Sequence, residues 1–180
     1  QEIKEAVTEL LEQRDGLMAG ICNGFQALIK LGLVPFGKIM DTDASFPTLT
    51  YNKIARHQSK LVRIRIASSN SPWLAATEVG DIYTVPVSHG QGRFMASPEL
   101  LKEMAADGRI ITQYVDMAGN ATSDIQFNPN GSDWAVEGIV SPDGRVLGKM
   151  GHSERIGAGL YKNVPGRFDM KMFESAVKYF

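Results

Sequence analysis

The chain has 180 residues, a length that suits one domain with a substantial core. Its net charge is −1, so it lacks the basic character of nucleic-acid-binding proteins, and no run of about 18 apolar residues predicts a membrane span. We therefore expect neither nucleic acid nor a membrane as a partner. A single cysteine cannot form an internal disulfide, and this predicts a reducing, cytoplasmic location.

The N-terminal part of the chain predicts a helix, a strand and a second helix. Apolar residues at helical spacing predict an amphipathic helix over 3–11. The short apolar segment 16–21 is typical of a buried strand. A helix follows over 24–31 and is expected to end at Gly32, because glycine is a common helix terminator. Two prolines and an Asp-Thr-Asp cluster predict a loop over 34–50.

The rest of the chain predicts further strands alternating with helices. Strict alternation predicts a strand over 61–66, and Ser97 followed by Pro98 predicts the start of a helix. The turn sequence 141–144 predicts a β-hairpin near 134–150. Interleaved helices and strands favour an α/β sheet covered on both faces. Other predicted elements are strands at 82–88 and 109–115 and a terminal helix at 172–180.

The only cysteine, Cys22, lies at the junction between the predicted strand and the helix that follows it. Such a sharp turn is typical of a nucleophile elbow, and we expect Gly20 and Gly24 to relieve its steric clashes. A thiol at a helix N-terminus is expected to have a lowered pKa, which favours the thiolate. The alternative is a buried, unreactive cysteine. Glycines on both sides and a strand that ends at the cysteine favour the nucleophile.

A cysteine nucleophile needs a base, and the chain offers three histidines. His152 is followed two residues later by Glu154, and in an extended segment both side chains point to one side, so the carboxylate can orient the ring. A chance His-x-Glu on a surface turn is the alternative. His89 ends a predicted strand before Gly90 and is a second candidate base, whereas His57 lies in a polar stretch typical of a solvated side chain. One cysteine and three scattered histidines form no metal-ligand pattern.

Three segments together resemble class I (triad-type) glutamine amidotransferase domains. They are GICNGFQ at 20–26, SHGQGRF at 88–94 and HSER at 152–155, in the order found in that family. The first two resemble one branch in particular, the glutaminase domain of phosphoribosylformylglycinamidine synthase. The resemblance extends from about residue 16 to residue 180.

This resemblance implies hydrolysis of glutamine to glutamate and ammonia through a cysteinyl thioester. Carried over by position, Cys22 is the nucleophile, His152 the base and Glu154 its orienting carboxylate. The backbone N–H of Asn23 supplies one oxyanion donor. The other substrate contacts implied are Gln26, Ser88, His89 and Gly90.

The resemblance also implies a partner. Ammonia passes to an ATP-dependent synthetase domain of the same polypeptide or complex, which makes formylglycinamidine ribonucleotide in de novo purine biosynthesis. ATP and Mg belong to that synthetase, and no cofactor is expected in this domain.

Two departures from the family pattern lead to further expectations. The usual Pro-His-Pro-Glu-Arg motif has Gly151 and Ser153 in place of its prolines, so the base is expected to be held less firmly. Only residues 1–15 precede the cysteine strand, whereas family members have several strands there. We therefore expect one N-terminally truncated domain over 1–180, with a three-layer, open, mostly parallel sheet that lacks its first strands. As an isolated fragment it is expected to be weakly active or inactive.

Two other functions are compatible with the same residues. One is a free-standing thiol hydrolase or peptidase on the same fold. The other is a non-catalytic docking module that regulates a synthetase.

Overall fold

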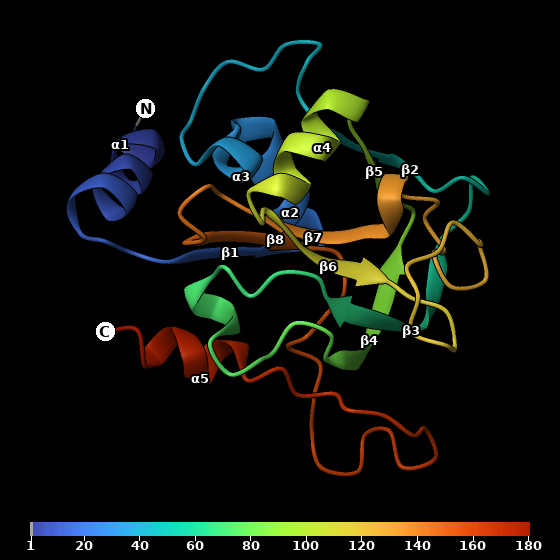
Figure 1. Ribbon diagram of the computed structural model, residues 1–180. Coiled ribbons are helices and arrows are strands. Elements are labelled where there is room, and N and C mark those ends of the chain that lie inside the picture. Colours follow the sequence, from blue (N-terminus) through green and yellow to red (C-terminus); the bar gives the residue numbers. More distant parts are fainter. Residues whose placement is uncertain (1) are drawn as a thin grey trace.

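A computed structural model describes residues 2–180. Six strands form one curled sheet in the order β1-β8-β7-β6-β3-β4, and two more form a small separate sheet (Figure 1). The strands of the main sheet are β1 (Met18–Ile21), β3 (Gln58–Ile66), β4 (Ile82–His89), β6 (Ile110–Tyr114), β7 (Val136–Val140) and β8 (Val146–Lys149); those of the small sheet are β2 (Thr48–Tyr51) and β5 (Gln91–Met95).

The prediction of a mostly parallel sheet is wrong. Only β1 and β8 pair in parallel; the pairings β8–β7, β7–β6, β6–β3 and β3–β4 are all antiparallel. Antiparallel neighbours need only a short connection, and residues 141–145 supply one between β7 and β8. Parallel pairing needs a crossover, which for β1 and β8 is most of the chain.

Helices cover both faces of the main sheet, as predicted. Figure 1 shows α2, α3 and α4 on one face, and α5 with the 3₁₀ helix Pro72–Leu74 on the other. A second 3₁₀ turn, Asp133–Ala135, precedes β7. The α-helices are α1 (Glu2–Thr8), which continues as a π-helical turn at Glu9–Gln13, α2 (Asn23–Leu31), α3 (Leu33–Phe36), α4 (Pro98–Ala106) and α5 (Met172–Val177).

The predicted helix ends agree with the structure, whereas one predicted loop does not. Gly32 ends α2 with a left-handed φ of 80°, and the Ser97 hydroxyl accepts the Leu100 N–H at 3.2 Å at the start of α4. The segment 34–50, expected to be a loop, contributes to α3 and contains most of β2. Strand β5 was not predicted either; it is specified by long-range pairing with β2 rather than by a local pattern.

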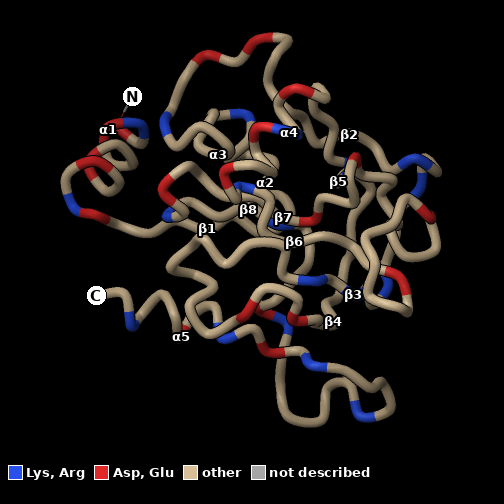
Figure 2. The backbone as a smooth tube through the Cα atoms, viewed as in Figure 1, with Lys and Arg blue, Asp and Glu red and all other residues tan. Residues whose placement is uncertain are grey.

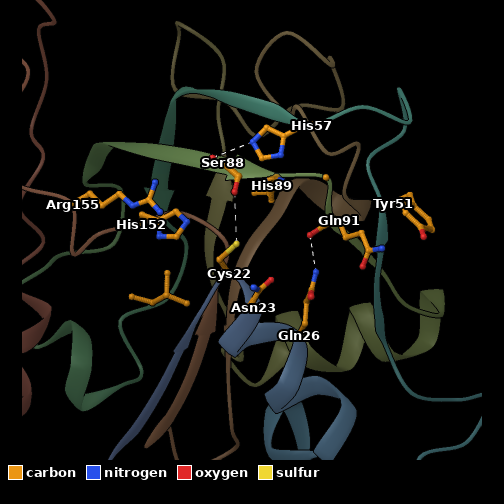
Figure 3. A pocket seen from close by; sticks show the side chains of 12 residues that line it. Cys22, Asn23, Gln26, Tyr51, His57, Ser88, His89, Gln91, His152 and Arg155 are labelled. Carbon is orange, nitrogen blue, oxygen red and sulfur yellow. Dashed lines mark hydrogen bonds between the residues drawn. The ribbon is translucent and has the colours of Figure 1, made fainter.

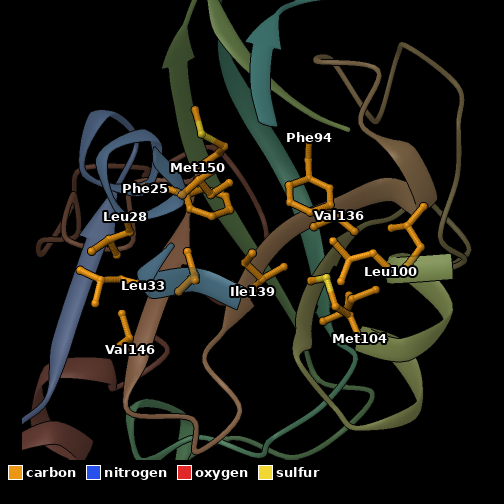
Figure 4. Packing of buried hydrophobic residues seen from close by; sticks show 14 of the residues in the cluster. Phe25, Leu28, Leu33, Phe94, Leu100, Met104, Val136, Ile139, Val146 and Met150 are labelled. Atoms are coloured by element: carbon orange, nitrogen blue, oxygen red, sulfur yellow. The ribbon is translucent and has the colours of Figure 1, made fainter. Parts of the chain in front are cut away.

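The hydrophobic core consists of two clusters, one on each face of the sheet. In the first, Phe25 of α2 and Met104 of α4 are fully buried around Ile139 of β7 (Figure 4). Ile110 and Ile111 are adjacent in β6 but belong to opposite clusters, because successive strand residues point to opposite faces. The sheet is therefore buried on both faces, with one cluster packed against each.

Charged residues of both signs are scattered over the described part of the chain (Figure 2). Within residues 2–180, every helix is too short or too polar to cross a membrane.

Candidate active site

Cys22 lies on a strained turn between β1 and α2, as predicted for an elbow. Its backbone has φ 56° and ψ −105°, a conformation that L-residues seldom adopt. A Cβ on Gly20 would lie 2.6 Å from the backbone of Gly24, so glycine is required at position 20. A Cβ on Gly24 would meet nothing within 4 Å, so the expected relief of clashes applies to Gly20 alone.

His152 and Glu154 form the predicted pair. The two side chains meet at 2.6 Å, between Nδ1 of the ring and Oε1 of the carboxylate. The His152 backbone N–H donates to the Pro86 carbonyl at 2.8 Å, which attaches the main chain of this segment to β4. Its Nε2 atom is buried and has no hydrogen-bond partner among residues 2–180. The ring therefore has one nitrogen held by a carboxylate and the other unused.

Cys22 and His152 line the same cavity, of about 560 Å³, although 130 residues separate them in the sequence. Figure 3 shows the Cys22 thiol and the His152 imidazole among the side chains that line this cavity. Glu154 is not part of the lining. The thiol is 4.0 Å from the Ser88 carbonyl oxygen. The described residues contain no group of three His, Cys, Asp or Glu side chains that could hold a metal ion. The cavity is lined by Ile21, Cys22, Asn23, Gln26, Tyr51, His57, Ser88, His89, Gly90, Gln91, His152 and Arg155.

All five residues expected to contact substrate lie in this lining, together with five that were not named as site residues: Ile21, Tyr51, His57, Gln91 and Arg155. Arg155 is one of these. Its position directly after the His-Ser-Glu triplet could have indicated from the sequence that it belongs to the site. Tyr51 and Gln91 meet there through the pairing of β2 with β5. His57 is exposed, as predicted, yet its ring Nε2 lies 3.1 Å from the Ser88 hydroxyl at the rim.

The expectation of a lowered pKa for the cysteine is not met in this geometry. Burial raises the pKa of the Cys22 thiol above its ordinary value. The Asn23 backbone N–H and the positive charge of Arg155 act in the opposite direction but are smaller effects. The thiol is thus predominantly protonated, and a base is needed to remove its proton.

His89, the second candidate base, lacks the support that His152 has. Its ring is 5% exposed, and neither ring nitrogen has a hydrogen-bond partner in the part of the chain described. Burial, aided by the nearby positive charge of His57, lowers the pKa of His89 to about 4. His89 is therefore neutral near pH 7, and no carboxylate among residues 2–180 is hydrogen-bonded to its ring.

This buried imidazole is expected to make the protein sensitive to acid. Between about pH 6.5 and pH 4 the unfolded histidine binds a proton that folded His89 does not, so stability falls as the pH falls. The loss attributable to His89 is on the order of 3 kcal/mol at pH 4. Urea unfolding at pH 7 and at pH 4 measures this fall in the free energy of unfolding. His89→Gln should lose less stability between the two pH values than the wild type. His57→Gln, which removes an exposed imidazole, should keep most of the wild-type loss; equal losses in all three proteins would contradict the assignment.

Comparisons with known proteins agree with this geometry. The family model of the CobB/CobQ-like glutamine amidotransferase domain matches residues 1–180. Phosphoribosylformylglycinamidine synthase subunit PurQ of Acaryochloris marina is 37% identical over 139 residues, 77% of this chain and 54% of the relative. The PurQ subunit of Symbiobacterium thermophilum is 33% identical over 177 residues, 98% of this chain and 68% of the relative. The solved structure of PurLQS from Thermotoga maritima superposes with a TM-score of 0.70 at 26% identity, covering 99% of this chain and 68% of that one. The chain thus spans between about half and two thirds of the length of these relatives.

Proposed function

The chain belongs to the CobB/CobQ-like glutamine amidotransferase domain family, and from this premise we propose that it is the glutaminase part of a phosphoribosylformylglycinamidine synthase. One observation carries the proposal. A cysteine on a strained elbow shares a cavity with a histidine whose far nitrogen is held by a glutamate at 2.6 Å.

In the proposed reaction Cys22 attacks the side-chain amide carbon of glutamine. His152 takes the thiol proton on Nε2, the nitrogen that is unused in the structure, and passes it to the departing ammonia. A water that gives its proton to His152 then attacks the γ-glutamyl thioester, and glutamate leaves as the thiol re-forms. Because burial raises the pKa of Cys22, this removal of the proton by the base is an essential step.

The remaining lining residues are proposed to bind glutamine. The backbone N–H of Asn23 directly follows the nucleophile and is one donor to the oxyanion. Gln26 is held in place by a 2.8 Å hydrogen bond from its amide to the Gln91 carbonyl oxygen. Ser88 and His89 lie across the cavity from Asn23 and Gln26 (Figure 3), and Gly90 is also part of the lining.

Partner and location follow from the same proposal. The relatives are named as subunits of a synthase, which supports delivery of ammonia to an ATP-dependent synthetase that makes formylglycinamidine ribonucleotide. ATP and Mg are proposed to act in that synthetase, and no cofactor in this domain. The single cysteine supports a cytoplasmic location.

A diazo-ketone analogue of glutamine is expected to label Cys22 and no other residue. Glutamine should compete with the label, whereas glutamate esters and γ-glutamyl peptides should not. Intact-mass measurement and peptide mapping detect the adduct, and Cys22→Ala is the unlabelled control.

Other outcomes would support the other two functions. Equal competition by γ-glutamyl peptides would indicate a thiol peptidase. A Cys22 that iodoacetamide alkylates, but that the glutamine analogue leaves unlabelled at any concentration, would indicate a docking module.

A further inference from the structure

A buried ion pair under the cavity is not used by the reaction just described. It joins Lys149, the last residue of β8, to Glu137 in β7 at 3.0 Å, and both side chains are 0% exposed. We propose that Lys149 is a positioning residue that fixes His152 relative to Cys22, with Glu137 holding its ammonium group. This inference rests on the proposed glutaminase function.

The main chain of Lys149 carries the nucleophile. Its carbonyl oxygen accepts the Cys22 backbone N–H at 2.8 Å, and Lys149 is the register partner of Ile21 in the parallel pairing of β1 with β8. The strained turn at Cys22 is thus attached directly to the backbone of Lys149.

The side chain of Lys149 holds the segment that carries the base. An ammonium group has three N–H donors, and all three are used. Apart from Glu137, they go to the Gly151 carbonyl oxygen at 3.0 Å and to the Ser153 hydroxyl at 2.9 Å. These acceptors lie immediately before and after His152. One residue therefore contacts the nucleophile through its backbone and both neighbours of the base through its side chain.

Glu137 completes the network from the other side. Its Oε1 also accepts the Gly151 backbone N–H at 2.6 Å, and its Oε2 accepts the Thr112 hydroxyl. Every polar atom of the pair therefore has a partner, as a buried charge requires.

Stability alone does not explain why the pair is there. Replacing a buried ion pair by well-packed apolar residues is often neutral or stabilising. The neighbouring Leu147 and Val146 in β8 show that this strand accommodates buried apolar side chains. An apolar pair could not supply the directional hydrogen bonds that the ion pair makes on both sides of His152.

The pair also accounts for the glycine and serine that stand where the family motif has prolines. A proline at 151 would lack the N–H that Glu137 accepts, and a Cβ there would lie 2.6 Å from Val85 Cγ2 and 2.8 Å from Glu137 Oε1. A proline at 153 would lack the hydroxyl that accepts from Lys149. In this proposal a charge network holds the base in place of rigid rings.

The direct test removes both charges together, so that neither is left buried alone. In the intact protein, Lys149→Met with Glu137→Gln should lower kcat for glutamine hydrolysis about 10- to 100-fold and change KM less than about twofold. The reason is that His152 shifts while the residues proposed to bind glutamine keep their positions.

Arg109→Met is the matched control. Arg109 is another buried cation, 3% exposed and paired with Glu103 and Asp107, but it lies outside the cavity lining. It should leave kcat and KM within about twofold. An unchanged kcat in the double variant would overturn the proposal.

A rescue separates positioning from general destabilisation. Adding Ser153→Pro to the double variant should recover part of the lost kcat, whereas Ser153→Pro alone, which removes the hydroxyl that accepts from Lys149, should lower kcat in the wild type. No recovery, together with a wild-type kcat for Ser153→Pro alone, would overturn the proposal. Circular dichroism shows whether the double variant folds. If it does not fold, the milder Ser153→Ala should still lower kcat about 3- to 10-fold with KM unchanged. An unchanged kcat in Ser153→Ala would then overturn the proposal.

A second readout does not depend on glutamine turnover. The rate at which iodoacetamide alkylates Cys22 is measured against pH, with His152→Gln as the reference for a thiol without its base. The double variant should give the reference profile, and a wild-type profile would overturn the positioning role. If the wild type hydrolyses no glutamine while the profiles still differ in the expected way, the glutaminase function fails and the positioning role stands.

Discussion

Replacing Cys22 by serine is expected to abolish glutamine-dependent synthesis by the assembled synthase, with a fall of about 10,000-fold or more in kcat/KM. Serine keeps the geometry of the elbow, but its hydroxyl is a far weaker nucleophile than a thiolate. The synthetase would not need this cysteine when ammonia is supplied directly. The measurement is synthesis of formylglycinamidine ribonucleotide with glutamine and, separately, with an ammonium salt.

Ammonia-dependent synthesis is the internal control for that substitution. It should stay within about twofold of the wild type, because Cys22 lies in the glutaminase cavity. Glutamine-dependent synthesis that survives in Cys22→Ser would exclude catalysis by this domain and favour a docking module.

Replacing Glu154 by glutamine is expected to lower kcat for glutamine hydrolysis by about 100- to 10,000-fold. A carboxylate only accepts hydrogen bonds, so Glu154 holds the His152 proton on Nδ1 and leaves Nε2, which has no partner among residues 2–180, as the acceptor for the thiol proton in the proposed reaction. The amide of glutamine can donate to Nδ1 instead, which stabilises the wrong tautomer. Steady-state kinetics with glutamine measure the loss.

A surface substitution of the same kind provides the control for Glu154. Glu174→Gln removes an exposed carboxylate that pairs with Lys171 on the other side of the sheet, and should change kcat less than twofold. His152→Gln should lose at least as much activity as Glu154→Gln. A larger loss at Glu154 than at His152 would contradict the role given to the carboxylate.

Local patterns predicted the elements whose signal is local. Gly32 ends α2 and Ser97 caps α4 through contacts within a few residues. The hairpin of β7 and β8 follows from the turn residues between them. Strands β2 and β5, by contrast, pair across more than 40 residues, and the segments that form them carry glycine or proline signals typical of loops.

The direction of the sheet was mispredicted for a related reason. Interleaved helices and strands favour parallel pairing only when each helix crosses over between neighbouring strands. Here α4 connects β5 of the small sheet to β6 of the main one, so it forms no such crossover. Which strands become neighbours depends on packing of the whole chain.

The sequence by itself determined the chemistry of the candidate site. The cysteine elbow and the His-x-Glu pair are short-range patterns, since the turn is specified by its own glycine and the carboxylate lies two residues from the ring it holds. Only the tertiary structure determined how the pKa values of the side chains in the site are shifted. Burial raises the pKa of Cys22 and lowers that of His89 because segments distant in sequence exclude water around them. Lys149 likewise contacts both Cys22 and the neighbours of His152 only because β8 lies between β1 and β7.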